Sequence, residues 1–327
     1  MIILTYRKKD PSFNSIENVF NALLPYFRNH IKKVELPYKN SGFINRFKNI
    51  WYVKRLAKNS MTHITGHDHY LAFGLKKENT ILTIHDIEFI KRSSGLKKFL
   101  LQKLWMDYPI AKVKLVTTVS EFSKQEILCL NNYKTPIQVI HNPLTLPIKY
   151  TTNKFNSNKP NILQIGAKAN KNILRLIEAL NGISCHLTII AKPNSAIIAA
   201  LNKNNVMYSF KSGLTNDEII QEYYTCDLVS FVSTYEGFGL PIIEAQAAGR
   251  VVITSNVASM PEVAGDGAYF VNPYDTNEIR KGILELINNN SLREVLIKNG
   301  LENVKRFEPQ KIANQYLELY NQVLNET

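Results

Sequence analysis

Short apolar runs rich in β-branched residues alternate with helical patterns along most of the chain. Such alternation indicates parallel sheets with crossover helices. Each half of the chain therefore predicts its own doubly wound α/β unit. The predicted strands are residues 2–6, 33–36, 63–65, 80–84, 115–119 and 137–140 in the first half, and residues 161–165, 186–190, 206–210, 228–232, 251–254 and 268–271 in the second.

A proline-containing stretch, residues 142–160, separates the two halves and shows no sustained periodicity, which is typical of a linker. We expect domains at residues 1–150 and 151–308, because a chain of 327 residues suits two domains of roughly 100 to 200 residues. Two such units leave a cleft at the carboxyl ends of both sheets, where open α/β folds bind ligands. Helical patterns follow the last strand at residues 276–288, 291–306 and 309–324, and we expect the last helix, about 309–327, to pack back on the first domain.

The composition is that of a folded protein, with 45% hydrophobic and 20% charged residues and a mean hydropathy of −0.17. No run approaches the roughly 18 to 20 apolar residues that a membrane-spanning helix requires. The cysteines Cys129, Cys185 and Cys226 form neither a disulfide framework nor a zinc pattern. These features predict a cytoplasmic protein.

The positive charge lies in the first half of the chain. Residues 1–150 carry 24 Lys and Arg against 10 Asp and Glu, a net charge of +14, whereas residues 151–327 carry 16 against 17, a net charge of −1. A basic half could bind nucleic acid, an anionic membrane surface or a phosphorylated substrate. Since nothing in the sequence resembles a helix-turn-helix, RRM or zinc module, we expect no nucleic acid as a partner.

The most informative segment is Ser233-Thr234-Tyr235-Glu236-Gly237-Phe238-Gly239-Leu240-Pro241-Ile242-Ile243-Glu244-Ala245, directly after an apolar strand. Gly237 and Gly239 permit a sharp turn, and Pro241 suits the first turn of a helix. A helix start at this place favours a phosphate or another anion. Glu236 and Glu244 can accept hydrogen bonds from sugar hydroxyls. The alternative is that Glu244 complements the helix dipole and that the glycines serve a tight turn.

This segment resembles the E-G-F-G-L-P-x-x-E-A sequence of the retaining glycosyltransferases with a GT-B fold, in the Glu-x7-Glu group that is similar to glycosyltransferase family 4. Residues 249–253 and 261–263 fall where that group has its G-x-P-V-I and P-E-V elements. The resemblance implies two Rossmann-like domains that face a cleft, with acceptor binding in residues 1–150 and donor binding in residues 151–308. It also implies no catalytic metal and no cofactor besides a nucleoside diphosphate sugar, which is a co-substrate.

The resemblance also implies site residues. Glu236 and His85 are the predicted catalytic residues, where Glu236 holds the hydroxyls of the donor sugar and Glu244 those of the ribose. The predicted nucleotide-binding residues are Lys171, Lys168, Gly166, Leu214, Gly237, Phe238, Gly239, Leu240 and Glu244. The predicted acceptor residues are Asn14, Ser15, His63, His67 and Asp86. The alternative for the two lysines is that they are merely solvated, and for Leu214 that it is an ordinary packed residue.

Two parts of the first half leave questions open. The family often has a Gly-Gly loop after its first strand, whereas residues 7–17 of this chain contain no glycine, so other groups must make those contacts. The spacing of His63, His67, Asp68 and His69 could suggest a metal site. We interpret these residues instead as lining of the acceptor site or the cleft.

Two segments, residues 43–58 and 97–105, combine apolar residues at helical spacing with Lys and Arg. In one interpretation they are helices that pack their apolar residues on the sheet. In the other interpretation they dock on an anionic membrane leaflet. Such peripheral contact with the membrane would suit a lipid-linked acceptor.

Together, the resemblance implies a retaining transferase that moves a hexose or deoxyhexose from a UDP- or GDP-sugar to a saccharide or lipid-linked acceptor. We expect it to act in surface polysaccharide or lipopolysaccharide synthesis, in the cytoplasm or at the inner face of the cytoplasmic membrane. The alternatives are a sugar synthase or phosphorylase of the same fold, and a sugar-nucleotide-binding protein without catalytic activity.

Overall fold

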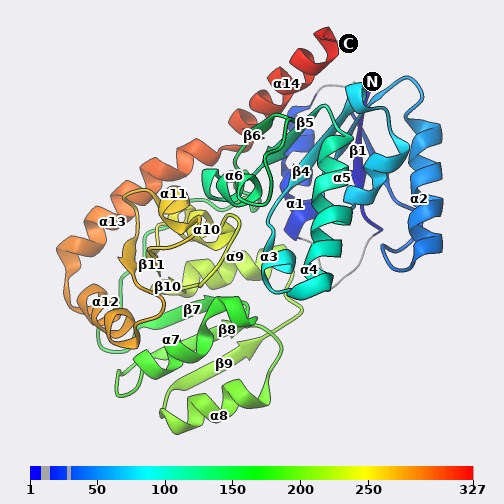
Figure 1. Cartoon of the computed structure of the whole chain (residues 1–327). Coiled ribbons are helices and arrows are strands. Elements are labelled where there is room, and N and C mark those ends of the chain that lie inside the picture. Colours follow the sequence, from blue (N-terminus) through cyan, green and yellow to red (C-terminus); the bar gives the residue numbers. More distant parts are fainter. Residues whose placement is uncertain (9–14, 28–30, 327) are drawn as a thin grey trace. The chain divides into compact units, whose positions relative to one another are not determined.

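The computed structural model describes residues 1–8, 15–27 and 31–326 (Figure 1). Its internal contacts divide the chain into two compact units. Unit 1 comprises Met1–Thr145 and Glu308–Thr327, and unit 2 comprises Leu146–Phe307. Unit 1 is therefore discontinuous in sequence, because the chain leaves it at the linker and returns to it with the last helix.

Unit 1 contains a parallel sheet of six strands in the order β2-β1-β3-β4-β5-β6. Every residue of β1 and β4 is buried, as expected for strands covered on both faces. Its strands are β1 (Ile2–Tyr6), β2 (Ile31–Glu35), β3 (Met61–Ile64), β4 (Thr80–Ile84), β5 (Leu115–Thr118) and β6 (Ile137–Val139). Its helices are α1 (Ser15–Leu23), α2 (Phe43–Leu56), α3 (Glu88–Lys91), α4 (Gly95–Gln102), α5 (Tyr108–Ala111), α6 (Glu121–Leu128) and α14 (Pro309–Asn325), with a π-helical segment, Lys103–Asp107, between α4 and α5 and short 3-10 helices at Leu24–Tyr26, His69–Gly74 and Lys77–Asn79.

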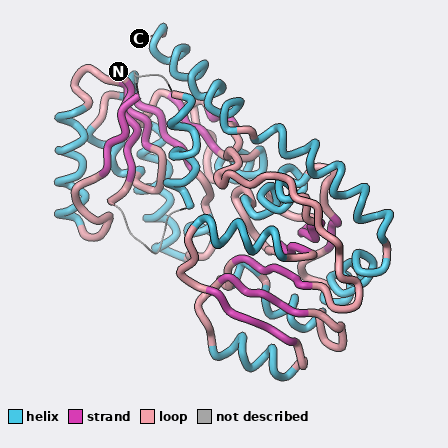
Figure 2. The backbone as a smooth tube through the Cα atoms, turned by 180° about the vertical axis from the view of Figure 1, so that it is seen from behind, coloured by secondary structure: helices cyan, strands magenta, loops and turns pink. Residues whose placement is uncertain are grey.

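Unit 2 contains a second parallel sheet of six strands in the order β12-β11-β10-β7-β8-β9. Figure 2 shows the strands of each unit in magenta, with helices in cyan around them. The strands of unit 2 are β7 (Asn161–Ile165), β8 (His186–Ile190), β9 (Met207–Lys211), β10 (Leu228–Phe231), β11 (Val251–Ser255) and β12 (Tyr269–Val271). Its helices are α7 (Ile173–Ala179), α8 (Ser195–Lys203), α9 (Asn216–Thr225), α10 (Leu240–Ala248), α11 (Met260–Ala264), α12 (Thr276–Asn288) and α13 (Asn290–Asn303), with 3-10 helices at Ala169–Lys171 and Val304–Phe307.

The strand orders fix where each sheet can bind a ligand. In unit 2 the order reverses between β7 and β10, and in unit 1 it reverses between β1 and β3. Open α/β sheets bind ligands at such a switch point, beyond the carboxyl ends of the strands. The loops that matter in unit 2 are therefore residues 166–172 and 232–239.

The prediction of two doubly wound α/β units is confirmed, and each predicted strand corresponds to an observed strand. The differences lie at strand ends. The second strand was expected at 33–36 and runs from Ile31 to Glu35, and the strand expected at 206–210 runs from Met207 to Lys211. The helix expected at 291–306 ends as α13 at Asn303 and continues as a 3-10 turn.

Helix α14 completes the core of unit 1. Its residues Tyr316 and Tyr320 are buried, and the Tyr316 ring lies 5.4 Å from the ring of Phe20 in α1, measured between centroids. The Tyr320 hydroxyl lies 2.7 Å from Nδ1 of His63 in β3. The last helix of the chain thus packs on residues near its start.

Helix α2 corrects one interpretation of the sequence. The apolar residues Phe43, Phe47 and Trp51 were expected to pack on the sheet in one of the two interpretations, yet all three are exposed. The face that packs inward carries Asn49 and Val53, which are fully buried. Asn49 is satisfied there because its amide nitrogen donates to the carbonyl of Tyr38 (3.0 Å).

Candidate functional site

The switch point of unit 2 brings together two of the predicted site residues. Lys171 lies in the loop after β7, and Glu236 lies in the loop after β10. The Lys171 ammonium Nζ is 2.8 Å from Oε1 of Glu236, and both side chains are about five-sixths buried, with exposed fractions of 17% and 16%. The Asn170 amide Nδ2 donates to the same carboxylate oxygen at 3.1 Å. The result is a cation, an amide and a carboxylate at one edge of the sheet.

The loop after β7 forms a slot for the lysine. Gly166 has a φ of +81°, and a Cβ at this position would lie 3.3 Å from Cε of Lys171. On its other side the ammonium lies 4.5 Å from the centroid of the Phe231 ring, a favourable cation–π distance. Asn172 anchors the loop, because its amide donates to the carbonyls of Val232 (3.0 Å) and Pro273 (2.7 Å).

The loop after β10 is held by hydrogen bonds to its backbone. The Ser259 hydroxyl lies within hydrogen-bonding distance of the carbonyl oxygens of Glu236 (3.0 Å) and Phe238 (2.6 Å), while the Asn170 amide donates to the Tyr235 carbonyl (3.0 Å). Gly239 opens α10 with a φ of +117°, a backbone conformation that residues with a Cβ rarely adopt. The loop thus leads directly into the N-terminus of a nine-residue helix.

Glu244 lies in the second turn of α10, four residues after Leu240. It is 7% exposed, and the hydroxyl of Tyr223 in α9 donates to its Oε2 at 2.6 Å. Burial, with the nearby Glu244 carboxylate, raises the pKa of Tyr223 well above its usual range, so the phenol stays protonated as a donor. Glu244 is therefore held by a specific partner, Tyr223. A carboxylate that only complemented the helix dipole would not need such a partner.

Lys168 and Leu214 lie less close to this pair. Lys168 is exposed and stands just before the 3-10 turn that contains Lys171. Leu214 is half-buried in the loop after β9. Because β8 lies between β9 and β7, that loop is two strands away from the loop of Lys171.

In unit 1, polar residues gather at the β1/β3 switch point. Arg7 follows β1 and forms an ion pair with Glu17 of α1. Together with His67 and Asp68, which follow β3, they line a small cavity of about 10 Å³. His85 follows β4, the next strand along, and its ring centroid lies 6.3 Å from that of His67. Arg7 and Glu17 are charged groups in the segment where the family's Gly-Gly loop was expected.

His85 is a neutral side chain in a fixed tautomer. Burial lowers its pKa to about 4, so the ring is uncharged near pH 7. Its Nε2 lies 2.8 Å from the carbonyl oxygen of Thr65, and a carbonyl can only accept. Nε2 therefore carries the proton, which leaves Nδ1 as an acceptor.

The structure corrects the expectation for His63. Its side chain is fully buried in the core, with Nδ1 at 2.7 Å from the Tyr320 hydroxyl and Nε2 at 2.6 Å from the Thr83 hydroxyl. Burial lowers its pKa to about 3. A histidine enclosed in this way does not line an acceptor site, so that prediction is wrong.

The other predicted acceptor residues have different outcomes. Asn14 lies outside the described residues, and Ser15 is the first residue of α1, with a side chain that is not described. Oδ1 of Asp86 accepts from the backbone N–H of Glu88, the first residue of α3, at 3.0 Å. Among residues 1–8, 15–27 and 31–326, no three His, Cys, Asp or Glu side chains form a group that could hold a metal ion.

Sequence reasoning missed three residues that hold the site of unit 2, namely Asn170, Ser259 and Tyr223. Asn170 could have been noticed, since it stands between the two predicted lysines. Ser259 lies two residues before the P-E-V element, and Tyr223 lies in a helix far from the motif. Their contacts with Glu236 and Glu244 depend on tertiary structure, which spacing does not disclose.

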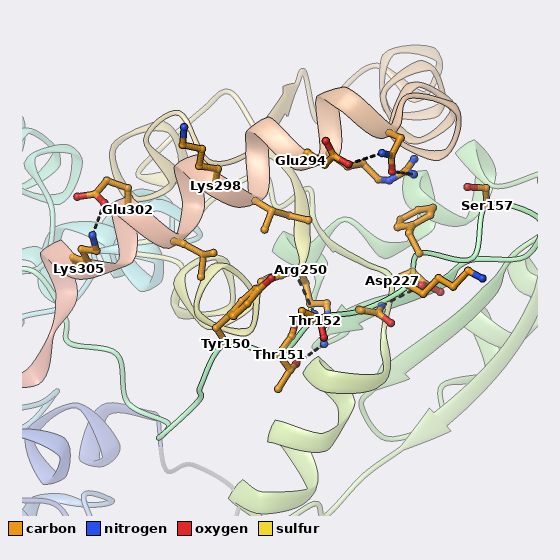
Figure 3. Close-up of a pocket in the computed structure, with 18 residues that line it drawn as sticks. Tyr150, Thr151, Thr152, Ser157, Asp227, Arg250, Glu294, Lys298, Glu302 and Lys305 are labelled. Carbon is orange, nitrogen blue, oxygen red and sulfur yellow. Dashed lines mark hydrogen bonds and ion pairs between the residues drawn. The ribbon is translucent and has the colours of Figure 1, made fainter.

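A wide pocket of unit 2 lies elsewhere (Figure 3). It measures about 880 Å³ and lies between the linker, at Tyr150 to Phe155, and helix α13. It borders Asp227 and Arg250, which precede β10 and β11, so it lies at the amino ends of these strands. The buried Arg250 guanidinium donates hydrogen bonds to backbone carbonyls, among them those of Thr151 (2.8 Å) and Tyr223 (2.9 Å). The chemistry that the sequence predicts is at the opposite edge of the sheet.

Two six-stranded parallel units of this kind define the GT-B class of fold, and solved structures share it. A structure of HepE from Anabaena in complex with UDP and glucose has a TM-score of 0.80 and 15% identity, covering 98% of this chain and 99% of that chain. Sucrose-phosphate synthase from Thermosynechococcus elongatus has a TM-score of 0.78 and 17% identity, covering 100% of this chain and 99% of that one. At these identities the likeness concerns the fold.

Sequence comparisons find glycosyltransferases among the proteins similar to this chain. Residues 151–303 match the family model described as glycosyl transferases group 1. The O-antigen chain mannosyltransferase B of Escherichia coli is 28% identical over 277 residues, covering 74% of this chain and 70% of the relative. Residues 151–303 are therefore similar to glycosyltransferases, and the chain shares the GT-B fold of the solved structures. In the part of the chain that the structure describes, each helix is too short or too polar to cross a lipid bilayer.

Proposed function

We propose that this protein is a retaining glycosyltransferase that moves a hexose or deoxyhexose from a nucleoside diphosphate sugar to a saccharide or lipid-linked acceptor. The observation that carries the proposal is the Lys171–Glu236 pair at the β7/β10 switch point of unit 2, next to the start of α10. A departing diphosphate needs a cation and N–H donors, and a donor sugar needs hydrogen-bond acceptors. Both kinds of group meet here.

Each donor-binding residue has a proposed role. The diphosphate lies against Lys171 and the N-terminus of α10, with the backbone at Gly237, Phe238 and Leu240 alongside. A donor diphosphate competes with Glu236 for the Lys171 ammonium, so donor binding releases the Glu236 carboxylate toward the sugar hydroxyls. Glu244 accepts from the ribose hydroxyls through the carboxylate that Tyr223 orients. Lys168 contributes a second cation, Gly166 leaves room for Lys171, and Leu214 lies against the base.

The reaction needs no enzyme nucleophile. The bond between the anomeric carbon and the phosphate oxygen breaks, and its electron pair stays on the phosphate. The acceptor oxygen bonds to the anomeric carbon from the same face, and its proton passes to the leaving phosphate. Oε1 of Glu236 already accepts from Asn170 and Lys171, which suits a positioning and electrostatic role. We propose that this chemistry proceeds without a metal ion.

Unit 1 supplies the acceptor side in this proposal. The fixed tautomer of His85 supports a role for Nδ1 as an acceptor toward a sugar hydroxyl, and half-buried His67 lies next to it. One carboxylate oxygen of Asp86 accepts from the backbone N–H of Glu88, and the other can accept from a hydroxyl of the acceptor. The acceptor belongs to a surface polysaccharide or lipopolysaccharide in synthesis, and the enzyme works in the cytoplasm at the inner face of the membrane, in peripheral contact with it.

The first donor to test is GDP-mannose, because the similar Escherichia coli protein is named as a mannosyltransferase. We would incubate the protein with GDP-mannose, then with UDP- and dTDP-sugars, and measure the release of nucleoside diphosphate and the transfer of sugar to saccharide and lipid-linked acceptors. We expect Glu236→Gln and Lys171→Ala each to lower kcat by about a hundredfold or more. Lys203→Ala, an exposed lysine of α8 in the same unit, is the matched control and should leave the rate unchanged.

The same assay separates the alternatives. Transfer to a phosphorylated sugar or to inorganic phosphate, rather than to a saccharide chain, would indicate a synthase or phosphorylase. Donor binding without turnover would indicate a sugar-nucleotide-binding protein. A product with inverted anomeric configuration in NMR would contradict retention, and a rate that EDTA abolishes and Mg²⁺ restores would contradict metal independence.

A further inference from the structure

Helix α2 presents an apolar stripe to solvent. Phe43, Phe47 and Trp51 repeat at intervals of four residues and are 88%, 71% and 56% exposed, and Ile44 beside them is 72% exposed. The opposite side of the helix carries the buried Asn49 and Val53 and packs on unit 1. Large apolar side chains concentrated on one exposed face are unusual for a soluble surface and mark an interaction site.

Helix α4 and the π-helical turn after it repeat this arrangement. All residues of α4 are exposed or half-buried. Large apolar residues again recur at helical spacing, and the exposed ones are Leu96, Phe99 and Leu100 in α4 and Leu104 in the turn. The two elements are connected, because the Arg46 guanidinium of α2 stacks 4.6 Å from the centroid of the Trp105 ring in the turn after α4.

The chain around both helices is strongly basic. Residues 36–67 contain six Lys and Arg and no Asp or Glu, and residues 89–106 contain five and none. Exposed cations flank the apolar stripes at Lys48, Lys54, Arg55, Lys97 and Lys98. Two aromatic side chains also lie under cations, since Arg55 is 4.5 Å from the Trp51 ring centroid and Lys103 is 5.8 Å from that of Phe99.

We propose that α2 and α4 form the surface through which the protein docks on an anionic lipid bilayer. The docking surface comprises Phe43, Ile44, Phe47 and Trp51 of α2, Leu96, Phe99 and Leu100 of α4, and the cations Lys48, Lys54, Arg55, Lys97 and Lys98. The apolar side chains enter the headgroup region, and the cations contact anionic lipid headgroups. The inference rests on the proposed function at a membrane and names the surface responsible.

Charge decides between a bilayer and other occupants. A second copy of the chain would bring two basic surfaces together, and like charges oppose that contact. A nucleic acid duplex would match the charge, but its paired bases and phosphate backbone would leave the Phe43 and Phe47 side chains without an apolar partner. A bilayer with anionic headgroups satisfies both the charge and the apolar stripes.

The test measures binding of the full chain to vesicles, without sugar nucleotides. Vesicles of phosphatidylglycerol and phosphatidylcholine are compared with vesicles of phosphatidylcholine alone, by sedimentation and by the fluorescence of Trp51 in a Trp105→Phe background. We expect binding to the anionic vesicles with a blue shift of the Trp51 emission, and binding that weakens as salt is raised. Phe43→Ser with Phe47→Ser, and separately Lys54→Glu with Arg55→Glu, should each weaken binding at least about tenfold.

Matched controls lie in unit 2, where Leu174→Ser with Val295→Ser replaces two side chains of similar exposure (53% and 54%) and should leave vesicle binding unchanged. Thermal unfolding midpoints of all variants should stay within about 2 °C of the parent, since the substituted side chains are exposed. The proposal is overturned if neutral vesicles bind equally well, if both pairs of variants bind like the parent, or if ultracentrifugation shows a dimer that the Phe43→Ser, Phe47→Ser variant abolishes.

Transfer to a soluble saccharide acceptor separates this proposal from the proposed function. The docking variants should keep the parent's rate in that assay, because no membrane takes part. If the protein binds vesicles but consumes no sugar nucleotide, the proposed transferase function is overturned and the proposed docking surface stands. If the protein turns over a sugar nucleotide but does not bind vesicles, the docking surface is overturned and the transferase function stands.

Discussion

The two units share a six-stranded parallel sheet but differ in how their helices are used. In unit 2, helix α10 is buried from Ile242 to Ala248 and holds Glu244 in a fixed position. In unit 1, helix α4 has only exposed and half-buried residues. One architecture thus provides a rigid ligand site in one unit and leaves apolar helices exposed in the other.

The buried polar groups differ in the same way. In unit 2, buried charged side chains form hydrogen bonds with the backbone. Arg250 donates to carbonyls, and Asp227 accepts from the N–H groups of Asn156 (3.1 Å) and Asn161 (2.8 Å). Unit 1 instead buries neutral histidines at His63, His69 and His85. Stability should therefore respond to different perturbations in the two units.

The largest effect should come from Arg250, which is 2% exposed and also lies 2.7 Å from the Thr151 hydroxyl. Arg250→Met leaves several buried carbonyls without a donor, so we expect it to lower the free energy of unfolding of unit 2 by about 3 to 5 kcal/mol. Urea denaturation measures this, with the exposed Lys281→Met of α12 as the control. A loss below about 1 kcal/mol would show that the carbonyls find other partners.

Acidification should weaken unit 1. Burial lowers the pKa of His63 and His69 to about 3 and that of His85 to about 4. Their contribution is fully present above the unfolded pKa near 6.5 and is lost as pH falls, by about 2 kcal/mol per histidine between pH 7 and 5. Asp68, whose pKa burial raises to about 6, acts in the opposite direction and offsets part of this loss.

Urea denaturation at pH 7 and pH 5 tests this with His69→Asn. The asparagine amide can still donate to the Trp105 carbonyl, which His69 Nδ1 approaches at 2.6 Å, but it does not titrate. The variant should lose about 2 kcal/mol less than the parent between these pH values. An equal loss in both proteins would contradict the assignment of the pH dependence to this histidine.

A smaller effect on stability, with a clear effect on donor binding, is expected for Tyr223→Phe. The change removes the 2.6 Å bond to Glu244, which should cost about 1 to 2 kcal/mol of stability and raise the KM for the donor about tenfold at nearly constant kcat. The neighbouring Tyr224→Phe removes a hydroxyl that accepts from the N–H of the exposed Lys149, and serves as the control. Steady-state kinetics measure the KM for the donor. Equal KM values in Tyr223→Phe and the unsubstituted protein would rule out this role of Tyr223.

The smallest effect is expected in α4. Phe99→Ser should change the free energy of unfolding by less than about 0.5 kcal/mol, because the side chain is exposed. The same kind of change in α10, Ile243→Ser, should cost about 3 kcal/mol or more, because Ile243 is fully buried. If thermal unfolding shows Phe99→Ser to be as harmful as Ile243→Ser, the contrast between the two helices does not hold.

Much of the fold could be predicted from the sequence. Strands covered on both faces appear as continuous apolar runs between turn residues, so β4, β7 and β8 were predicted with their observed bounds. The proximity of Lys171 and Glu236 follows from parallel topology, since both residues come after strands that are neighbours in the sheet.

The direction of individual side chains could not be predicted. All residues of β3 are buried, so its sequence has no alternation that would show which face His63 occupies. In α2 the exposed stripe of Phe43, Phe47 and Trp51 has the spacing of a packing face, and only the contacts of Asn49 with Tyr38 and Tyr70 show which side faces inward. Periodicity identifies a helix but does not say what covers it.

The discontinuity of unit 1 has a consequence for synthesis on the ribosome. Tyr316 and Tyr320 of α14 fill the core beside Phe20 and His63, so this core cannot close until translation has passed Tyr320. Unit 2 is continuous and can fold as soon as it emerges. We expect the first half of the chain to wait, with its apolar strands accessible to chaperones, until the final helix is released.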